Sequence, residues 1–255
     1  MWDSARKTEL VASGEQHSYD AFGTVDDVET GRQSLFCPKL DILPAAQRLI
    51  WEELNQIPSC FVLYGGTAMA LRLGHRQSVD FDFFSNERFE PSNLLWSLGS
   101  LREARVDQRG DNTLSLVVDR SGPVRLSFFG EVGMNRIQDP DLAPGSRLQV
   151  ASLLDLTATK LKTIQQRAEA KDYRDVAAAL DAGIHLAEAI GAATAVFGKI
   201  FNAMAGLKAL TYFGDGNLPS LPQTIQDRLR TSAEGLKLGA LPQMLPRPGI
   251  QRQDV

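Results

Sequence analysis

Hydrophobic and polar positions alternate in recognisable ways from about residue 41 of this chain. Between residues 41 and 58 the apolar side chains recur at helical spacing, and Pro58 ends the pattern, so a helix is predicted there. The apolar run CFVLYGG, residues 60–66, is typical of a buried strand closed by two glycines. A helix is predicted over 67–73, and the strict alternation of SVDFDFFS, residues 78–85, predicts a second strand.

A helix predicted over 92–101 and a hairpin of two predicted strands, 113–119 and 124–129, complete the first half of the chain. The second half has a different pattern. From residue 152 onward the sequence is rich in Ala and Leu and predicts five helices, near 152–167, 171–182, 185–197, 199–210 and 222–236. The predicted fold class is therefore α+β, with a helical bundle following the strands.

Four segments follow from these patterns. Residues 1–36 lack a sustained hydrophobic period and are expected to be a flexible acidic leader. Residues 37–150 form the expected α+β domain and 151–213 a helical domain that closes over it. Residues 214–255, rich in Gly, Pro and polar side chains, predict one helix and a disordered tail.

Composition narrows the class of protein. Hydrophobic residues make up 43% and charged residues 23% of 255 residues, which is ordinary for a soluble globular protein and excludes collagen-like, coiled-coil and disulfide-scaffold chains. The two cysteines, Cys37 and Cys60, indicate a reducing compartment and argue against a zinc site. The N-terminus has no apolar signal region and no run reaches about 20 apolar residues, so we expect a cytoplasmic protein without a membrane segment.

Charge adds little about partners. The chain has 27 Lys plus Arg against 31 Asp plus Glu, and residues 1–36 carry the whole net charge of −4. A formally neutral body lacks the basic footprint typical of nucleic-acid binding, although it leaves room for a local basic groove.

Two aspartates in the second predicted strand form the first candidate site. Because side chains alternate along a strand, Asp80 and Asp82 share one face, whereas Val79, Phe81 and Phe83 share an apolar face directed at the core. Two carboxylates about 6 to 7 Å apart repel by roughly 3 kcal/mol at an effective dielectric constant near 20. A divalent cation turns this repulsion into attraction, and Mg²⁺ favours one or two carboxylates together with substrate phosphates.

Gly65 and Gly66 precede a predicted helix, whose first N–H groups are free to bind an anion. Alone, a double glycine is usually a tight turn, and two alternate aspartates are usually a solvated strand face. Here both motifs occur in order, with 13 residues between Gly66 and Asp80, which favours metal-assisted phosphate chemistry.

The segment GGTAMALRLGHRQSVDFDFF, residues 65–84, resembles nucleotidyltransferases of the polymerase-β-like superfamily, and more narrowly the AbiEii/AbiGii toxins of abortive-infection and toxin–antitoxin systems. A second segment, DLTATKLKTIQQRAEAKDYRDVAAAL, residues 155–180, resembles a further signature of that family. The resemblance covers roughly residues 42–210. It implies a nucleotidyltransferase-type mixed sheet with flanking helices, Mg²⁺ or Mn²⁺ as cofactor, an NTP as substrate and an antitoxin protein as partner.

The second segment supplies the other candidate residues. Lys160 and Arg167 lie two helical turns apart and project from one face, and Asp172 and Asp175 share a face of the next helix. On their own these residues are typical of a solvated, salt-bridged helix face. The resemblance implies that they oppose the aspartate strand, with Lys160 and Asp175 joining the catalytic group. The expected nucleotide-binding residues are Gly65, Gly66, Thr67, Arg76, Arg167, Lys171 and Asp172.

One position departs from the resemblance. Polymerase-β-like enzymes commonly carry a third carboxylate on a later strand, and Ser127 stands where that acid is expected. A serine is neither a charged metal ligand nor a strong base at neutral pH, so a single Mg²⁺ held by Asp80 and Asp82 is the expectation. Two alternatives remain. One is a non-catalytic module that binds a nucleotide or a partner, and the other is a phosphoryl transferase that uses the same cleft. The acceptor hydroxyl is equally open among the 3′ end of a tRNA, a protein and a small molecule.

Overall fold

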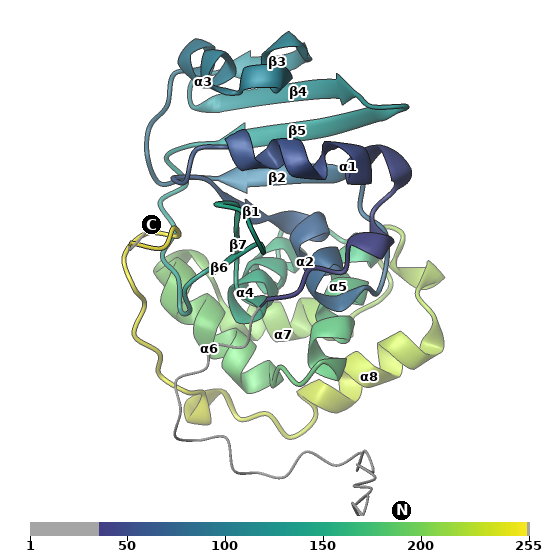
Figure 1. Cartoon of the computed structure of the whole chain (residues 1–255). Helices are drawn as coiled ribbons and strands as arrows, with labels where there is room; N and C mark the ends of the chain where they lie inside the picture. The colour runs from purple at the N-terminus through teal and green to yellow at the C-terminus, as the bar shows by residue number, and fades with distance from the viewer. Residues whose placement is uncertain (1–35, 254–255) are drawn as a thin grey trace, which may run out of the picture. The chain divides into compact units, whose positions relative to one another are not determined.

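The computed structural model describes residues 36–253. The predicted acidic leader therefore lies outside the described residues, apart from its last position. The elements below all belong to one compact unit (Figure 1).

The first half is built on a mixed sheet of seven strands, in the order β3-β4-β5-β2-β1-β7-β6. β1 and β2 are antiparallel, whereas β5 runs parallel to β2 and β7 parallel to β1. The strands are β1 Val62–Tyr64, β2 Asp80–Phe84, β3 Arg105–Gly110, β4 Thr113–Asp119, β5 Pro123–Phe129, β6 Asp141–Leu142 and β7 Gln149–Val150. This sheet with its flanking helices confirms the predicted α+β class.

Within residues 36–253, three α-helices flank the sheet in the first half, and five α-helices follow it. They are α1 Ala45–Ile50, α2 Gly65–Leu73, α3 Pro91–Ser97, α4 Leu153–Ile164, α5 Ala170–Asp181, α6 Leu186–Phe197, α7 Ala203–Thr211 and α8 Gln223–Ala233. α2 packs against β2 on one side and against α4 and α5 on the other, so it joins the sheet to the helical bundle.

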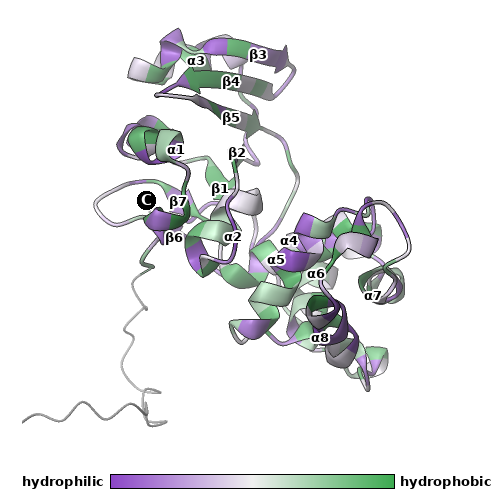
Figure 2. Cartoon of the chain, turned by 90° about the vertical axis from the view of Figure 1, so that its right-hand side faces the viewer, coloured by the Kyte–Doolittle hydropathy of each residue, from purple (hydrophilic) through white to green (hydrophobic). Residues whose placement is uncertain are grey.

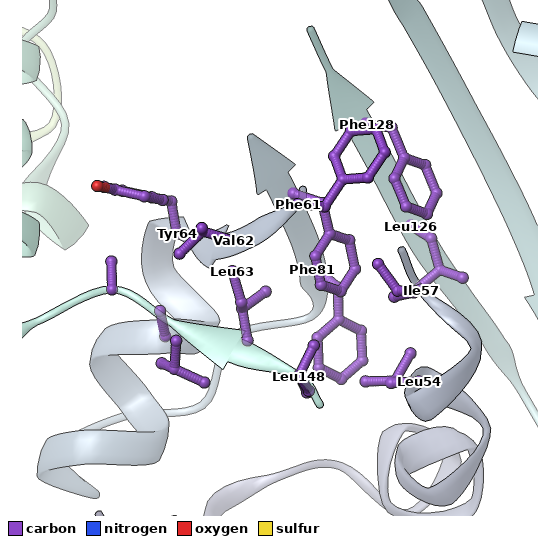
Figure 3. Packing of buried hydrophobic residues seen from close by; sticks show 14 of the residues in the cluster. Leu54, Ile57, Phe61, Val62, Leu63, Tyr64, Phe81, Leu126, Phe128 and Leu148 are labelled. Carbon is purple, nitrogen blue, oxygen red and sulfur yellow. The ribbon is translucent and has the colours of Figure 1, made fainter. Parts of the chain in front are cut away.

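The core of the first half forms where the apolar faces of the central strands meet the chain leading into β1 (Figure 3). Phe81 and Phe83 of β2 are fully buried, and the Phe83 ring stacks on Phe128 of β5 with centroids 5.2 Å apart. Phe61 meets the Phe128 ring edge-on at 5.3 Å. Aromatic packing of this kind anchors β2, so the side chains on its other face are held in place.

The helical half has its own core. α4 packs against α5 and α6, and the buried residues include Leu161, Val176 and Ile190. Ser152 caps α4 by accepting a hydrogen bond from the backbone N–H of Asp155. The cap fixes where α4 begins and therefore which of its side chains face α2.

Three local predictions differ from the structure. The helix expected over 41–58 is an α-helix only over Ala45–Ile50 and continues as a 3₁₀ helix, Trp51–Gln56. β3 was not predicted because all six of its residues are exposed and it carries no apolar alternation. Figure 2 shows hydrophobic stretches in β4 and β5 and hydrophilic ones in β3. Val79 does not join the apolar face, because β2 begins one residue later and Val79 is 62% exposed.

The expected disordered tail also differs from what is observed. After α8 the chain returns to the sheet half, where Arg247 pairs with Arg136 through two backbone hydrogen bonds (Figure 1). Ile250 is 1% exposed, and the guanidinium of Arg136 donates a hydrogen bond to the Pro248 carbonyl at 2.7 Å. Composition missed this segment because its order depends on a buried arginine that lies far away in the sequence.

Within residues 36–253, no single helix has both the length and the hydropathy needed to cross a membrane. The bent pair Ala170–Asp181 and Leu186–Ile200 meets that criterion only together, at 120° to each other.

Candidate active site

The site starts at the abrupt change from β1 to α2. Gly65 is the first residue of the helix, with φ +73°, a value that glycine adopts without steric cost. A Cβ at this position would lie 2.5 Å from Oδ2 of Asp82. Gly65 therefore lets the helix start lie directly against the aspartate strand.

The N-terminus of α2 is open to a ligand. Tyr64, the residue before the helix, contributes no side-chain cap, so the first backbone N–H groups of α2 lack the usual side-chain acceptor. Gly66 lines the pocket, and a Cβ there would lie 2.7 Å from Oγ of Ser78. Thr67 was expected to bind nucleotide, but it is fully buried and its hydroxyl donates a hydrogen bond to the Asp80 carbonyl. Thr67 thus fixes β2 against α2, and its side chain does not line the pocket.

Asp80 and Asp82 share the pocket face of β2, as the alternation predicted. The Asp80 side chain is 50% exposed. Burial raises the pKa of Asp82, the negative charge of Asp80 raises it further, and the charges of Lys160, Lys171 and Arg167 oppose this increase. The nearby positive charges therefore do not fully offset the cost of ionising the buried Asp82 carboxyl. A cation bound beside it would supply the missing positive charge.

One face of α4 forms the opposite wall of the site. The resulting pocket has a volume of about 460 Å³ and connects the start of α2, the strand β2 and the helix α4. Its lining residues are Gly65, Gly66, Ser78, Asp80, Asp82, Phe84, Leu156, Thr159, Lys160, Thr163, Gln166, Arg167 and Lys171. The pocket therefore brings two carboxylates, three cationic side chains and a helix N-terminus together.

Behind this wall lies a buried ion network centred on Lys160. Its Nζ donates a hydrogen bond to Oδ1 of Asp172 at 2.8 Å and forms an ion pair with Oδ2 of Asp175 at 2.7 Å, and both aspartates are fully buried. Burial by itself would raise the pKa of Asp172, but hydrogen bonds from Arg167 and Lys160 outweigh it and hold the pKa below its usual value. Neither aspartate lines the pocket. Both aspartates form ion pairs with Lys160, and Asp172 also pairs with Arg167, so they hold these two cationic side chains in place.

Two side chains from the loop between α2 and β2 also contact the Asp175 carboxylate. Arg76 donates to its two carboxylate oxygens at 2.6 and 2.8 Å, and Nε2 of His75 lies 2.7 Å from Oδ1. These hydrogen bonds and the charge of Lys160 hold the pKa of Asp175 well below its ordinary value, although burial works in the opposite direction. Arg76 was expected to bind nucleotide. The structure instead pairs it with Asp175 and leaves it outside the pocket lining.

Two cations remain at the pocket rim. Arg167 donates to Oδ2 of Asp172 at 2.8 Å while its side chain stays 44% exposed, and Lys171 lies 2.8 Å from Glu169 with 53% exposure. The hydrogen bond from Arg167 to Asp172 raises the pKa of the guanidinium. Both side chains line the pocket, although the residue pattern alone is typical of a solvated helix face and only the family resemblance implied a place in the site.

Sequence reasoning missed several of the lining residues. Phe84 follows Asp82 by two positions, so the strand alternation that paired the aspartates also places it on the pocket face. Leu156, Thr159 and Thr163 lie on α4 with Lys160, and Leu156 and Thr163 are three or four positions from it, which puts them on its side of the helix. Ser78 precedes β2 by two positions, so the same alternation places it on the face of Asp80 and Asp82, whereas Gln166 lies just beyond the end of α4.

The residues present fit one divalent cation. Asp80 and Asp82 offer two carboxylates on one face, and Mg²⁺ is commonly held by one or two carboxylates plus substrate phosphates. Within residues 36–253, no group of three or more His, Cys, Asp or Glu side chains lies close enough together to hold a metal ion without substrate. Ser127, opposite Asp82 in the parallel register, is buried and hydrogen-bonded to Ser115 at 3.2 Å.

Comparisons with known proteins agree with this geometry. Residues 49–242 match the family model described as nucleotidyl transferase AbiEii toxin, type IV toxin–antitoxin system. An uncharacterized protein of Aquifex aeolicus is 30% identical over 138 residues, which cover 52% of this chain and 65% of that protein. The alignment thus spans slightly less than two thirds of that relative's length.

The fold is also found among solved structures. MenT4, a nucleotidyltransferase toxin from Mycobacterium tuberculosis, superposes with a TM-score of 0.54 over 75% of this chain and 81% of its own, at 16% sequence identity. At that identity the likeness concerns the fold alone. Since the family model covers most of the chain and the aspartate strand, Lys160 and the helix start all meet in one pocket, the chain belongs to the AbiEii family of nucleotidyltransferase toxins.

Proposed function

We propose that this protein transfers a nucleoside monophosphate from an NTP to an acceptor hydroxyl, with Mg²⁺ or Mn²⁺ as cofactor. The acceptor oxygen forms a bond to the α-phosphorus, the bond from the α-phosphorus to the bridging oxygen breaks, and pyrophosphate leaves. The proton of the acceptor hydroxyl passes to solvent in this exchange. The observation that carries the proposal is the pocket itself, in which two carboxylates face three cations and an uncapped helix start.

The cationic side of the pocket suits the triphosphate. The free N–H groups at Gly65 and Gly66, with Arg167 and Lys171, bind the β- and γ-phosphates, since a helix N-terminus and cationic side chains both favour anions. Lys160 neutralises charge that develops on the leaving pyrophosphate. Its position is fixed because its ammonium group forms ion pairs with the buried carboxylates of Asp172 and Asp175. Most of the catalysis is therefore positioning and electrostatics.

Asp80 and Asp82 are the residues that would hold the cation. A divalent ion bound there supplies positive charge for the triphosphate and orients it. The raised pKa of Asp82 supports this assignment, because the ionised carboxylate gains most from an added positive charge.

The biological setting follows from the family. We infer that the protein is the toxin of a type IV pair and that an antitoxin protein opposes it in the cytoplasm. The acceptor we favour is the 3′ end of a tRNA, with a protein hydroxyl as the competing acceptor. The cations that line the pocket, two of them well exposed, support an acceptor that carries phosphate.

A labelling experiment tests the reaction. Wild-type protein and the Asp80→Ala/Asp82→Ala double variant are incubated with Mg²⁺, each α-³²P-labelled NTP in turn, total bacterial RNA and total cell protein. Label transferred by the wild type alone supports nucleotidyl transfer and identifies both the base and the acceptor class. Label transferred only from γ-³²P-labelled NTP would show phosphoryl transfer instead. Nucleotide binding without transfer from either position would favour a non-catalytic binding module.

A further inference from the structure

Arg125 lies beside Asp80 on β5, two residues before Ser127, which stands where a third carboxylate is expected. β5 runs parallel to β2, and its register pairs Arg125 with Asp80 and Ser127 with Asp82. Paired residues on neighbouring strands project from the same face about 4.8 Å apart. The strand next to the two aspartates therefore carries a guanidinium beside Asp80, just outside the residues that line the pocket.

The guanidinium is held close to Asp80 without occupying its oxygens. Nη1 of Arg125 lies 2.9 Å from Oδ2 of Asp107, whereas its Nε is 4.0 Å from Oδ1 of Asp80. Asp107 lies at an irregularity in the pairing of β3 with β4, between Val106 and Gln108, and such bulges redirect side chains. Asp107 is thus a positioning residue that orients Arg125 from two strands away.

A carboxylate and a guanidinium on this strand would act differently on a bound phosphate. A carboxylate at position 127, two residues further along the same strand, would bind a second cation. A guanidinium is itself a permanent cation, with planar donors that match the oxygens of a phosphoryl group. Half of the Arg125 side chain is exposed, so a substrate can reach it. Among residues 36–253, no three His, Cys, Asp or Glu side chains gather into a metal site, and the carboxylates that line the pocket are those of Asp80 and Asp82.

We propose that Arg125 binds the non-bridging oxygens of the reacting α-phosphoryl group and takes the place of a second metal ion. This inference rests on the proposed nucleotidyl transfer. Arg125 contributes charge and orientation to the reaction and takes no part in proton transfer.

The first test is chemical rescue. Arg125→Ala is expected to lower transfer by about 100-fold or more, the scale on which loss of a transition-state arginine acts. Guanidinium chloride at millimolar concentration should restore part of that activity, whereas sodium chloride at equal ionic strength should not. Arg105→Ala is the matched control, because Arg105 also contacts Asp107, is 68% exposed and lies in β3 at the edge of the sheet, with β4 and β5 between it and β2. It should retain activity within about threefold of wild type.

A second readout does not depend on turnover. Electron paramagnetic resonance with Mn²⁺ and an α,β-methylene NTP analogue should count one bound ion per wild-type chain. Two ions would overturn the substitution of arginine for metal. An Arg125→Ala variant as active as Arg105→Ala, or one that free guanidinium does not rescue, would overturn direct contact with the phosphoryl group. Absence of transfer by wild type with every NTP would overturn the proposed function, and this inference with it.

Discussion

Nζ of Lys160 in α4 lies 2.7 Å from Oδ2 of Asp175 in α5, and this buried pair connects the pocket wall to the loop that precedes the aspartate strand. The same carboxylate accepts both hydrogen bonds from Arg76, while His75 lies within hydrogen-bonding distance. One buried acid therefore sets the position of the cationic wall relative to β2.

Asp175→Asn should destabilise the fold strongly. The amide keeps one acceptor oxygen but places donors against Arg76 or Lys160, which leaves buried cations without compensation. Breaking one member of a buried ion group costs about 3–5 kcal/mol. Urea unfolding at neutral pH measures the loss, and Asp181→Asn, whose side chain is 65% exposed, is the matched control. Equal unfolding midpoints for the two variants would contradict the structural role.

Asp175 should also govern part of the acid sensitivity. The folded-state pKa of its carboxyl lies below the ordinary value of about 3.9, so ionisation favours the folded state. The stabilisation is fully present above that ordinary value and is lost as the pH falls through the folded-state pKa. The unfolding free energy of wild type should therefore fall more steeply than that of Asp175→Asn between about pH 5 and pH 2. Parallel curves for the two proteins would rule this out.

Gly65→Ala should lower the free energy of unfolding by more than the strain of its positive φ alone accounts for. The positive φ of an alanine at this position costs about 1–2 kcal/mol, and the added Cβ would also lie 2.5 Å from the Asp82 carboxylate. Gly133→Ala isolates the backbone effect, because φ at Gly133 is +61° and no atom lies within 4 Å of the added Cβ. We expect Gly65→Ala to lose roughly 1 kcal/mol more than this control, and most of the transfer activity with it. Equal stability and activity in both variants would show that the close approach has no role.

Asp82→Asn should stabilise the protein while abolishing transfer. Burial and Asp80 raise the folded-state pKa of Asp82, so the ionised carboxylate destabilises the fold as the pH rises through that value. Removing a unit charge about 6–7 Å from Asp80 relieves roughly 1–3 kcal/mol of repulsion at neutral pH. Thermal unfolding at neutral pH checks the increase against Asp111→Asn, an exposed acid in the turn between β3 and β4. A loss of stability in Asp82→Asn would contradict the expected repulsion.

The same comparison of wild type with Asp82→Asn tests the metal. Addition of Mg²⁺ with an NTP should raise the unfolding temperature of wild type, since a ligand that binds only the folded state stabilises it. The increase should shrink or vanish in Asp82→Asn and on chelation with EDTA. An unchanged increase in the variant would place the metal elsewhere.

Asp80→Ala should leave the fold intact and lower transfer by about two or more orders of magnitude. Its side chain is half exposed, and its carboxylate lines the pocket rather than the core. Circular dichroism and urea unfolding measure the first expectation, and α-³²P transfer measures the second. An unfolded variant would contradict the placement of Asp80 at the pocket surface.

Much of the site was visible in the residue pattern. Strand alternation put Asp80 and Asp82 on one face, and helical spacing put Lys160 and Arg167 on another, because both periods are properties of the backbone itself. The hairpin of β4 and β5 was predicted nearly to the residue from its turn and its alternating side chains. Local pattern thus determined which side chains share a face.

What lies opposite those faces was decided by the tertiary structure. Asp172, Asp175 and Arg76 were expected among the catalytic and nucleotide-binding residues, yet they form ion pairs behind the pocket wall, where both acids hold Lys160. Arg125 comes to lie beside Asp80 because β5 pairs with β2 in parallel, although the two strands are far apart in the sequence. Burial and strand register depend on contacts between distant segments. A periodic pattern therefore does not reveal that Asp172 and Asp175 pair with cations of the same chain, whereas Asp80 and Asp82 line the pocket and are open to a ligand.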